Sequence, residues 1–249
     1  MKIGTQLPEI KTKVPGPESH AWVDRLAARE CPAITARRSR RASALGAADD
    51  DQIVWSEAVG SNVLDVDGNR YVDLTAGFGV ASAGHRNPKV IAAAQAQMGR
   101  LVHVMGDAYP DTQRIVLLEL LAEKTGLDRA ILGSSGSDGV EAALKTGRMM
   151  SGRSKVLAFE SGYHGLSYGA LSVTGYHGDD FRGPFAAQLG DHVLRGAYGG
   201  AIPDLSDIGT VIVEPVQGRG GIRVPPAGWL QELADRTRAA GAVLVFDEV

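Results

Sequence analysis

The spacing of hydrophobic and polar residues changes along the chain and predicts three regions of different structure. Residues 1–17 are rich in proline and show little periodicity, so we expect an extended arm. Between residues 53 and 74, hydrophobic and polar positions alternate around an Asp-Gly turn at residues 67–69, which predicts a small antiparallel sheet. After residue 130, nearly continuous apolar runs alternate with stretches of helical spacing. This order is typical of a mostly parallel sheet covered by helices on both faces.

The same pattern gives approximate bounds for each element. Ser19 can cap the first helical stretch, Pro88 fits the first turn of the second, and Gly126 can end the third. The glycine-rich residues 75–86 fit no dinucleotide fingerprint, so we expect a loop there. We expect strands at residues 53–55, 63–66, 70–74, 130–132, 155–159, 210–213 and 242–246, and helices at residues 19–30, 88–98, 111–125, from 138 onward, and 227–240.

The stretch from residue 129 to residue 145 passes from an apolar run through a glycine-serine loop into a helix. The first N–H groups of a helix have no internal partner and the helix dipole is positive there, so such a loop can hold a phosphate. The hydroxyls of Ser135 and Ser137 can add side-chain bonds, and Gly136 lets the backbone approach closely. The same residues are also ordinary helix caps, so this stretch alone leaves both interpretations open.

Polar residues follow the later apolar runs: Tyr163 and His164 after one, Glu214 after the next, and Asp247 after the last. In parallel sheets, ligands gather beyond the carboxyl ends of the strands. A phosphate site, a flat aromatic ring and a carboxylate together suit pyridoxal phosphate, with Tyr163 stacked on its ring and Asp247 holding the ring nitrogen protonated. Taken singly, a capping aspartate, a core tyrosine and a structural histidine are the ordinary interpretations.

Composition limits the classes of function. The 249 residues are 44% hydrophobic and carry a formal net charge of −3, which favours a globular protein with small-molecule partners over nucleic acid or an anionic membrane. We interpret the basic residues 37–41 as a solvated segment. Cys31 is the only cysteine, so no internal disulfide is possible. Since there is no apolar signal segment and no apolar run of membrane-spanning length, we expect a soluble, cytoplasmic protein.

Between about residue 50 and residue 249 the chain contains, in this order, the motifs D-V-D-G-N-R-Y-V-D-L, G-H-R-N-P-K-V, S-S-G-S-D-G-V-E-A-A-L-K, G-Y-H-G, E-P-V-Q-G and F-D-E-V. This series resembles the class III pyridoxal-phosphate-dependent aminotransferases of fold type I, which include 4-aminobutyrate, ornithine and acetylornithine aminotransferases. The resemblance implies the α/β fold of that family, a mostly parallel sheet covered by helices and preceded by a small antiparallel sheet. It also implies that residues 1–75 form an arm and part of the small domain, and residues 76–249 the first part of the large domain.

The resemblance further implies roles for individual residues. Phe78 matches a position that lines the substrate pocket, and His164 and Glu214 match supporting positions near the cofactor. The residues expected to bind pyridoxal phosphate are Ser135, Gly136, Ser137, Tyr163, His164, Asp247 and Val249.

The chain departs from the family pattern at two positions. Relatives that act on 4-aminobutyrate or acetylornithine commonly have arginine after the aromatic-His-Gly motif, where this chain has Leu166. Relatives also often have a second glutamate in E-P-V-Q-G-E, where this chain has Arg219. A leucine cannot replace a guanidinium in binding a carboxylate. Our hypothesis is that this protein is not a standard 4-aminobutyrate enzyme and that Arg219 takes over part of the recognition of the substrate anion.

The resemblance implies a Schiff-base lysine downstream of Val249, and no lysine of this chain matches that position. We therefore expect the chain to be the N-terminal portion of an enzyme and to be inactive by itself. The expected reaction transfers an amino group from an amino acid or ω-amine donor to an oxo acid, in a homodimer with no nucleic-acid or membrane partner. Two alternatives stay open: a fold-type-I racemase, epimerase or aminomutase, and a non-catalytic cofactor-binding or dimerisation module.

Overall fold

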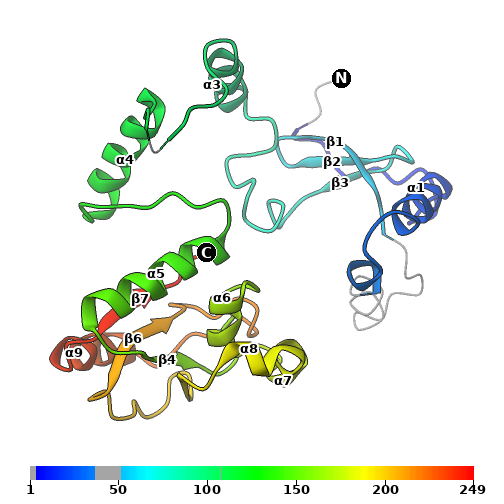
Figure 1. Ribbon diagram of the computed structural model, residues 1–249. Coiled ribbons are helices and arrows are strands. Elements are labelled where there is room, and N and C mark those ends of the chain that lie inside the picture. Colours follow the sequence, from blue (N-terminus) through cyan, green and yellow to red (C-terminus); the bar gives the residue numbers. More distant parts are fainter. Residues whose placement is uncertain (1–3, 37–51, 107) are drawn as a thin grey trace. The chain divides into compact units, whose positions relative to one another are not determined.

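The structure, a computed structural model, describes residues 4–36, 52–106 and 108–249 (Figure 1). These residues form two units, one within residues 1–111 and the other within residues 112–249. The boundary expected after residue 75 concerns the domains of the family and stays a prediction. The first unit holds α1 (Pro17–Ala27), β1 (Trp55–Val59), β2 (Asn62–Asp65), β3 (Arg70–Val72) and α3 (Pro88–Met98).

The second unit holds the longer succession of elements. They are α4 (Thr112–Thr125), α5 (Gly136–Ser151), β4 (Lys155–Phe159), α6 (Tyr168–Val173), α7 (Asp179–Arg182), the 3-10 helix η1 (Gly183–Phe185), α8 (Ala186–Leu189), β5 (Val193–Gly196), β6 (Ile208–Val213), α9 (Trp229–Ala239) and β7 (Val243–Phe246).

The first unit is built on a three-stranded antiparallel sheet in the order β1-β2-β3. The hairpin between β2 and β3 turns at residues 66–69, where Gly68 has a φ of 81° and so takes a left-handed conformation that suits glycine. Glu9 of the arm forms an antiparallel bridge with Arg70 of β3, with backbone hydrogen bonds of 2.9 and 2.8 Å. The predicted small antiparallel sheet is therefore confirmed, and the arm is tied to it.

The first helix begins earlier than the sequence predicts, and Ser19 is not its cap. Gly16 occupies the N-cap position of α1 and makes no side-chain cap. The cap comes from the hairpin turn instead: the carboxylate of Asp67 accepts hydrogen bonds from the N–H groups of Glu18 and Ser19 at 2.8 and 3.0 Å. Ser19 is buried and donates its own hydroxyl to the same carboxylate. A cap supplied from far along the chain leaves no local pattern in the sequence.

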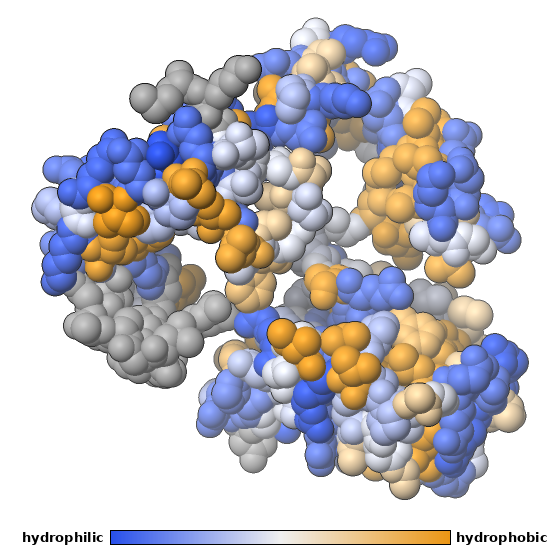
Figure 2. Space-filling model, turned by 180° about the vertical axis from the view of Figure 1, so that it is seen from behind, coloured by the Kyte–Doolittle hydropathy of each residue, from blue (hydrophilic) through white to orange (hydrophobic). Residues whose placement is uncertain are grey.

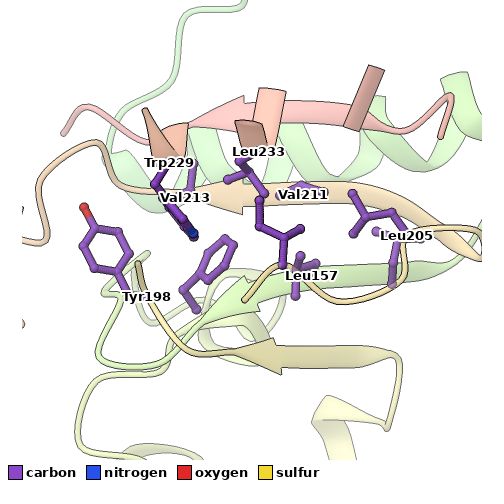
Figure 3. Close-up of a cluster of buried hydrophobic side chains, with 10 residues drawn as sticks. Leu157, Tyr198, Leu205, Val211, Val213, Trp229 and Leu233 are labelled. Carbon is purple, nitrogen blue, oxygen red and sulfur yellow. The ribbon is translucent and has the colours of Figure 1, made fainter. Parts of the chain in front are cut away.

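The second unit is a four-stranded parallel sheet in the order β5-β4-β6-β7. Side chains along its strands alternate between two hydrophobic clusters. Leu157, Val211 and Val213 pack with Trp229 and Leu233 of α9 on one face (Figure 3). On the other face, β4 and β6 contribute Val156, Ala158 and Ile212, which pack with Val140 of α5 and with Ala170 and Val173 of α6. The predicted parallel sheet covered on both faces is confirmed.

Some predicted elements are wrong or were missed. Residues 130–132 do not form a strand, because no strand of the described sheet pairs with them. The side chain of Ile131 is accordingly 75% exposed. The short elements β5, α6, α7 and α8 carry too little periodicity to be predicted. The helix expected at 111–125 is present as α4, but none of the residues of α3 or α4, all of which the structure describes, is buried. The basic residues 37–41 lie outside the described residues.

Candidate functional site

The glycine-serine loop caps α5 from both sides. Ser135 is the N-cap: its hydroxyl accepts from the N–H of Asp138 at 3.2 Å, and its carbonyl accepts from the N–H of Gly139. In return, the Asp138 carboxylate accepts from the N–H of Ser134 at 3.0 Å. This reciprocal cap fixes the start of the helix at Gly136, two residues earlier than expected. The first-turn N–H groups and the helix dipole therefore face the end of the sheet in a defined orientation.

Gly136 allows close approach between this helix start and the segment after β7. A Cβ added at Gly136 would lie 3.1 Å from Cγ1 of Val249 and 3.3 Å from Cγ2. Val249 is held in turn because its N–H donates to Oδ1 of Asp247 at 3.2 Å. Glycine is thus needed at this position for the close packing of the two segments.

Ser137 joins the same helix start to the loop after β4. Its hydroxyl accepts from the N–H of Leu166 at 3.2 Å. Gly165 has a φ of 119°, and an added Cβ there would collide with Ser137 Oγ. One turn further along α5, Glu141 accepts from the N–H of Gly169 at 2.7 Å and so caps α6. The sequence did not single out Glu141, because its partner lies 28 residues away.

A histidine–carboxylate pair joins β4 to β7. Nδ1 of His164 lies 2.7 Å from Oδ2 of Asp247, and the two residues are 3% and 9% exposed. Since an ionised carboxylate only accepts hydrogen bonds, His164 is the donor in this pair, and its second ring nitrogen is turned away from Asp247. The backbone of His164 is also fixed, because its N–H donates to the hydroxyl of Thr174 at 3.1 Å. The pair holds a carboxylate in a set orientation at the end of β7.

Glu214, at the end of β6, is buried and ties two loops together. Oε2 accepts from the N–H of Tyr163 at 2.9 Å, and Oε1 accepts from the N–H of Gly218 at 3.3 Å. Burial raises the pKa of the Glu214 carboxyl above its usual range, while the bond from Tyr163 and the nearby His164 act in the opposite direction.

Tyr163 presents its aromatic ring at the same edge. The guanidinium carbon of Arg219 lies 4.2 Å from the centre of the ring, over its face. Tyr176 contacts the ring edge-on, with centroids 6.0 Å apart and the planes at 88°. The two loops after β4 and β6 are therefore joined through side chains as well as through Glu214.

Gln217 is a further polar residue that the sequence did not single out. It is 1% exposed, and its amide nitrogen donates to the carbonyl of Glu160 at 2.7 Å. Its Oε1 atom is buried and has no hydrogen-bond partner among the described residues. An acceptor left unpaired inside a protein is costly, so it marks a place for a donor from a ligand or water. The signal in the sequence was a glutamine two residues after Pro215, in the loop that follows a buried strand.

These contacts connect six residues in a closed loop around the carboxyl end of the sheet, which we call the circuit: Gly136, Val249, Asp247, His164, Gly165 and Ser137. A cavity of about 330 Å³ lies between the first turns of α5 and the end of β7, lined by Ser135, Gly136, Asp247 and Val249 among others. That volume is at the small end of the range for ligand pockets, about 300–1,000 Å³. Tyr163 and His164 do not line this cavity but are joined to it through Asp247 and Glu214.

The circuit fits pyridoxal phosphate. The start of α5, with Ser135 and Gly136 in the lining of the cavity, suits a phosphate, and the oriented carboxylate of Asp247 in the same lining suits a ring nitrogen. Ser137 follows directly on α5 but does not line the cavity. The buried Oε1 of Gln217 offers an acceptor at the same edge of the sheet. Phe78 lies in the other unit, so its expected place in the substrate pocket stays a prediction.

Comparison with known proteins identifies the family. The family Aminotransferase class-III matches residues 45–192 and 203–249 of this chain. The chain belongs to the class-III aminotransferase family. The fold of this class-III aminotransferase chain is that of the fold type I transaminases, with the small antiparallel sheet and the helix-covered parallel sheet already described.

Relatives of known sequence carry transaminase names. Acetylornithine aminotransferase of Methanosarcina acetivorans is 38% identical over 201 residues, which cover 79% of this chain and 50% of that protein. The [LysW]-aminoadipate semialdehyde transaminase of Deinococcus radiodurans is 35% identical over 211 residues, covering 82% of this chain and 48% of that protein. This class-III aminotransferase chain therefore spans about half the length of the curated relatives it matches.

Solved structures agree with this assignment. An amine transaminase from an uncultivated Pseudomonas species, in its pyridoxal-phosphate-bound form, has a TM-score of 0.69 and 29% identity, covering 80% of this chain and 52% of that one. Ornithine aminotransferase of Toxoplasma gondii has a TM-score of 0.70 and 26% identity, covering 96% and 56%. Among the described residues of this class-III aminotransferase chain, no helix is both long and apolar enough to span a membrane.

Proposed function

We propose that this chain forms the phosphate-binding and ring-binding part of a pyridoxal-phosphate-dependent aminotransferase. The enzyme moves an amino group from an amino acid or ω-amine donor to an oxo acid. The observation that carries the proposal is the closed circuit, because it brings the start of α5 and the ends of β4 and β7 around one edge of the sheet. Family membership and the pyridoxal-phosphate-bound structural relative support the choice of cofactor.

Each group in the circuit has a defined task in this proposal. Ser135, Gly136 and Ser137 bind the phosphate through first-turn N–H groups and hydroxyls. Tyr163 would hold the cofactor ring by stacking, and Val249, which lines the cavity, would hold it by packing. When bound, pyridoxal phosphate supplies an electron sink for the carbon that carries the amino group.

The buried His164–Asp247 pair controls a proton on the cofactor ring. The hydrogen bond from His164 fixes which way the carboxylate of Asp247 points. A negative charge in so little water favours the protonated form of a ring nitrogen beside it. Glu214 supports the arrangement by holding the backbone of Tyr163.

The proposal assigns the Schiff-base lysine to sequence outside this chain. In the second unit, Lys124 and Lys155 pair with Glu123 and Asp207. Lys145 is exposed on α5. The chain spans about half the length of its relatives, which leaves room for that lysine in the remainder of a complete enzyme.

We further propose that the complete enzyme is a homodimer in the cytoplasm. Helices α3 and α4 expose large apolar side chains, and Figure 2 shows hydrophobic side chains gathered over α4. Such surfaces are typical of protein contacts. The exposed residues include Val90, Ile91, Ile115, Val116, Leu117 and Leu120.

The test of this function uses the complete gene product that contains this chain, loaded with pyridoxal phosphate. We expect an amino donor to yield its oxo product while an added oxo acid becomes an amino acid. An inverted or rearranged amine without oxo product would instead support the racemase or aminomutase alternative. Cofactor binding with neither result would support the non-catalytic module and contradict the proposal. Borohydride reduction followed by peptide mapping should label a lysine outside residues 1–249.

A further inference from the structure

Thr174 follows α6 directly, is fully buried, and has its hydroxyl bonded to the loop that comes after β4. The hydroxyl oxygen accepts from the N–H of His164 at 3.1 Å. The same group donates to the carbonyls of Gly165 at 3.1 Å and of Ala170 at 3.0 Å, which share its single proton. One side chain therefore holds the backbone on both sides of the His164 ring.

The position of Thr174 is itself fixed by contacts that do not involve His164. Its N–H donates to the carbonyl of Ala170 at 3.1 Å, and its carbonyl accepts from Nη1 of Arg182 at 2.7 Å. A Cβ added at the next residue, Gly175, would lie 2.5 Å from the carbonyl oxygen of Phe159, so the chain here packs directly on the end of β4. The hydroxyl is thus presented from a rigid support.

The two residues after Thr174 hold Tyr163 from the same side. The N–H groups of Gly175 and Tyr176 both donate to the carbonyl of Gly162, at 2.8 and 2.9 Å. The edge-on contact between the rings of Tyr176 and Tyr163 adds a side-chain link. Residues 174–176 therefore bind each of the consecutive residues 162–165.

The ring of His164 transmits this support to Asp247. Only χ1 and χ2 separate the ring from its backbone, and Nδ1 lies 2.7 Å from Oδ2 of Asp247. A hydrogen bond weakens as its angle departs from linear, so a shift of the His164 backbone changes how firmly the carboxylate is held. Thr174, His164 and Asp247 are all buried, so water does not readily replace a lost bond. Glu214 is a further ionisable neighbour of the pair and is kept in every variant below.

We propose that Thr174 is a positioning residue for the cofactor ring: through His164 it orients the Asp247 carboxylate and so sets how firmly the ring nitrogen keeps its proton. Thr174 does not line the cavity between α5 and β7, so its effect passes through the histidine. This inference rests on the proposed function, because it concerns the same pyridoxal phosphate site.

The first test follows the proton itself. The complete gene product is loaded with pyridoxal phosphate carrying nitrogen-15 in the ring, and the NMR shift of that nitrogen is titrated against pH. Thr174→Val keeps the branched shape without the hydroxyl, and the ring nitrogen should lose its proton about one pH unit lower, as expected for one buried hydrogen bond. Thr174→Ser keeps the hydroxyl and should match the wild type. An unchanged titration in Thr174→Val overturns the inference.

The matched control is Ser172→Ala, which removes a buried hydroxyl that donates to the carbonyl of Gly169 within α6. It should leave the titration of the ring nitrogen unchanged, and a shift equal to that of Thr174→Val would reduce Thr174 to a structural residue and contradict the proposal. Circular dichroism checks folding; if Thr174→Val does not fold, Thr174→Ala is compared with Thr174→Ser by the same criterion.

A double variant tests the route through the histidine. In a His164→Gln background the ring that Thr174 orients is gone, so adding Thr174→Val should move the titration little further. Additive shifts would show that Thr174 acts by another route and would overturn its role as a positioning residue.

Turnover of an amino donor, measured separately, distinguishes this inference from the proposed function. Transamination by the wild type with no shift in Thr174→Val refutes the inference and leaves the function standing. The expected shift without transamination upholds the role of Thr174 and refutes the proposed reaction. A wild-type protein that does not bind pyridoxal phosphate overturns both.

Discussion

Replacing Gly147 by alanine tests how closely α5 is seated on the sheet. A Cβ at Gly147 would lie 2.9 Å from Cγ2 of Thr210 and would collide with its hydroxyl oxygen. Thr210 is buried in β6, which has a strand on each side, so it has little freedom to move. Alanine favours a helix over glycine by about 1 kcal/mol, whereas overpacking costs about 1–3 kcal/mol. We expect the collision to dominate and the free energy of unfolding to fall by about 1–2 kcal/mol.

The control lies on the same helix. Gly139 has no atom within 4 Å of an added Cβ, so Gly139→Ala should gain up to about 1 kcal/mol. Thr210→Ala should relieve the collision, so the double variant should recover part of the loss. Urea unfolding followed by circular dichroism gives these differences. If Gly147→Ala is as stable as Gly139→Ala, α5 is not seated as described and the reasoning is refuted.

Three further predictions concern single carboxylates. Asp67→Ala should speed amide exchange at Glu18 and Ser19, because it removes the cap of α1, whereas Asp24→Ala on the same helix should not. Burial raises the pKa of Glu214 in the folded state, so the free energy of unfolding of the wild type should fall as pH rises from the ordinary carboxyl range through that raised pKa. In urea titrations, Glu214→Gln should flatten this dependence of stability on pH. An unchanged pH dependence in the variant would contradict the prediction. Hydrogen bonds lower the pKa of Asp73 to about 2, and the bond from His85 has the largest effect. The stability that Asp73 contributes should therefore be present above its ordinary pKa and be lost as pH falls toward 2. In the wild type, amide exchange at Gly77, whose N–H donates to Asp73, should become faster over that pH range, and Asp73→Asn should remove this dependence on pH.

The sequence predicts those parts of the fold that depend on local pattern. The helix at 88–98 and the strand at 155–159 have the predicted bounds, because a proline and a continuous apolar run mark them. The cap of α1 by Asp67 and the cap of α6 by Glu141 could not be predicted, because each joins residues far apart in the chain. The run at 130–132 shows the converse: an apolar pattern alone does not make a strand without a neighbour to pair with.

The candidate site was predictable in part for a similar reason. Residues placed at strand ends and at a helix start, such as Asp247 and Gly136, follow from the order of elements and the geometry of a parallel sheet. The contacts that join them do not. They depend on how the loops fold in space. Examples are the hydrogen bond between His164 and Asp247, the two hydrogen bonds that Glu214 accepts from two different loops, and the unpaired oxygen of Gln217.

The most direct test of the central claim is a crystal structure of the complete gene product with pyridoxal phosphate bound. The account predicts the phosphate within hydrogen-bonding distance of the N–H groups of Gly136 and Ser137, and the ring nitrogen within hydrogen-bonding distance of the Asp247 carboxylate. Density for the cofactor elsewhere, or a ring whose nitrogen does not meet Asp247, would contradict it.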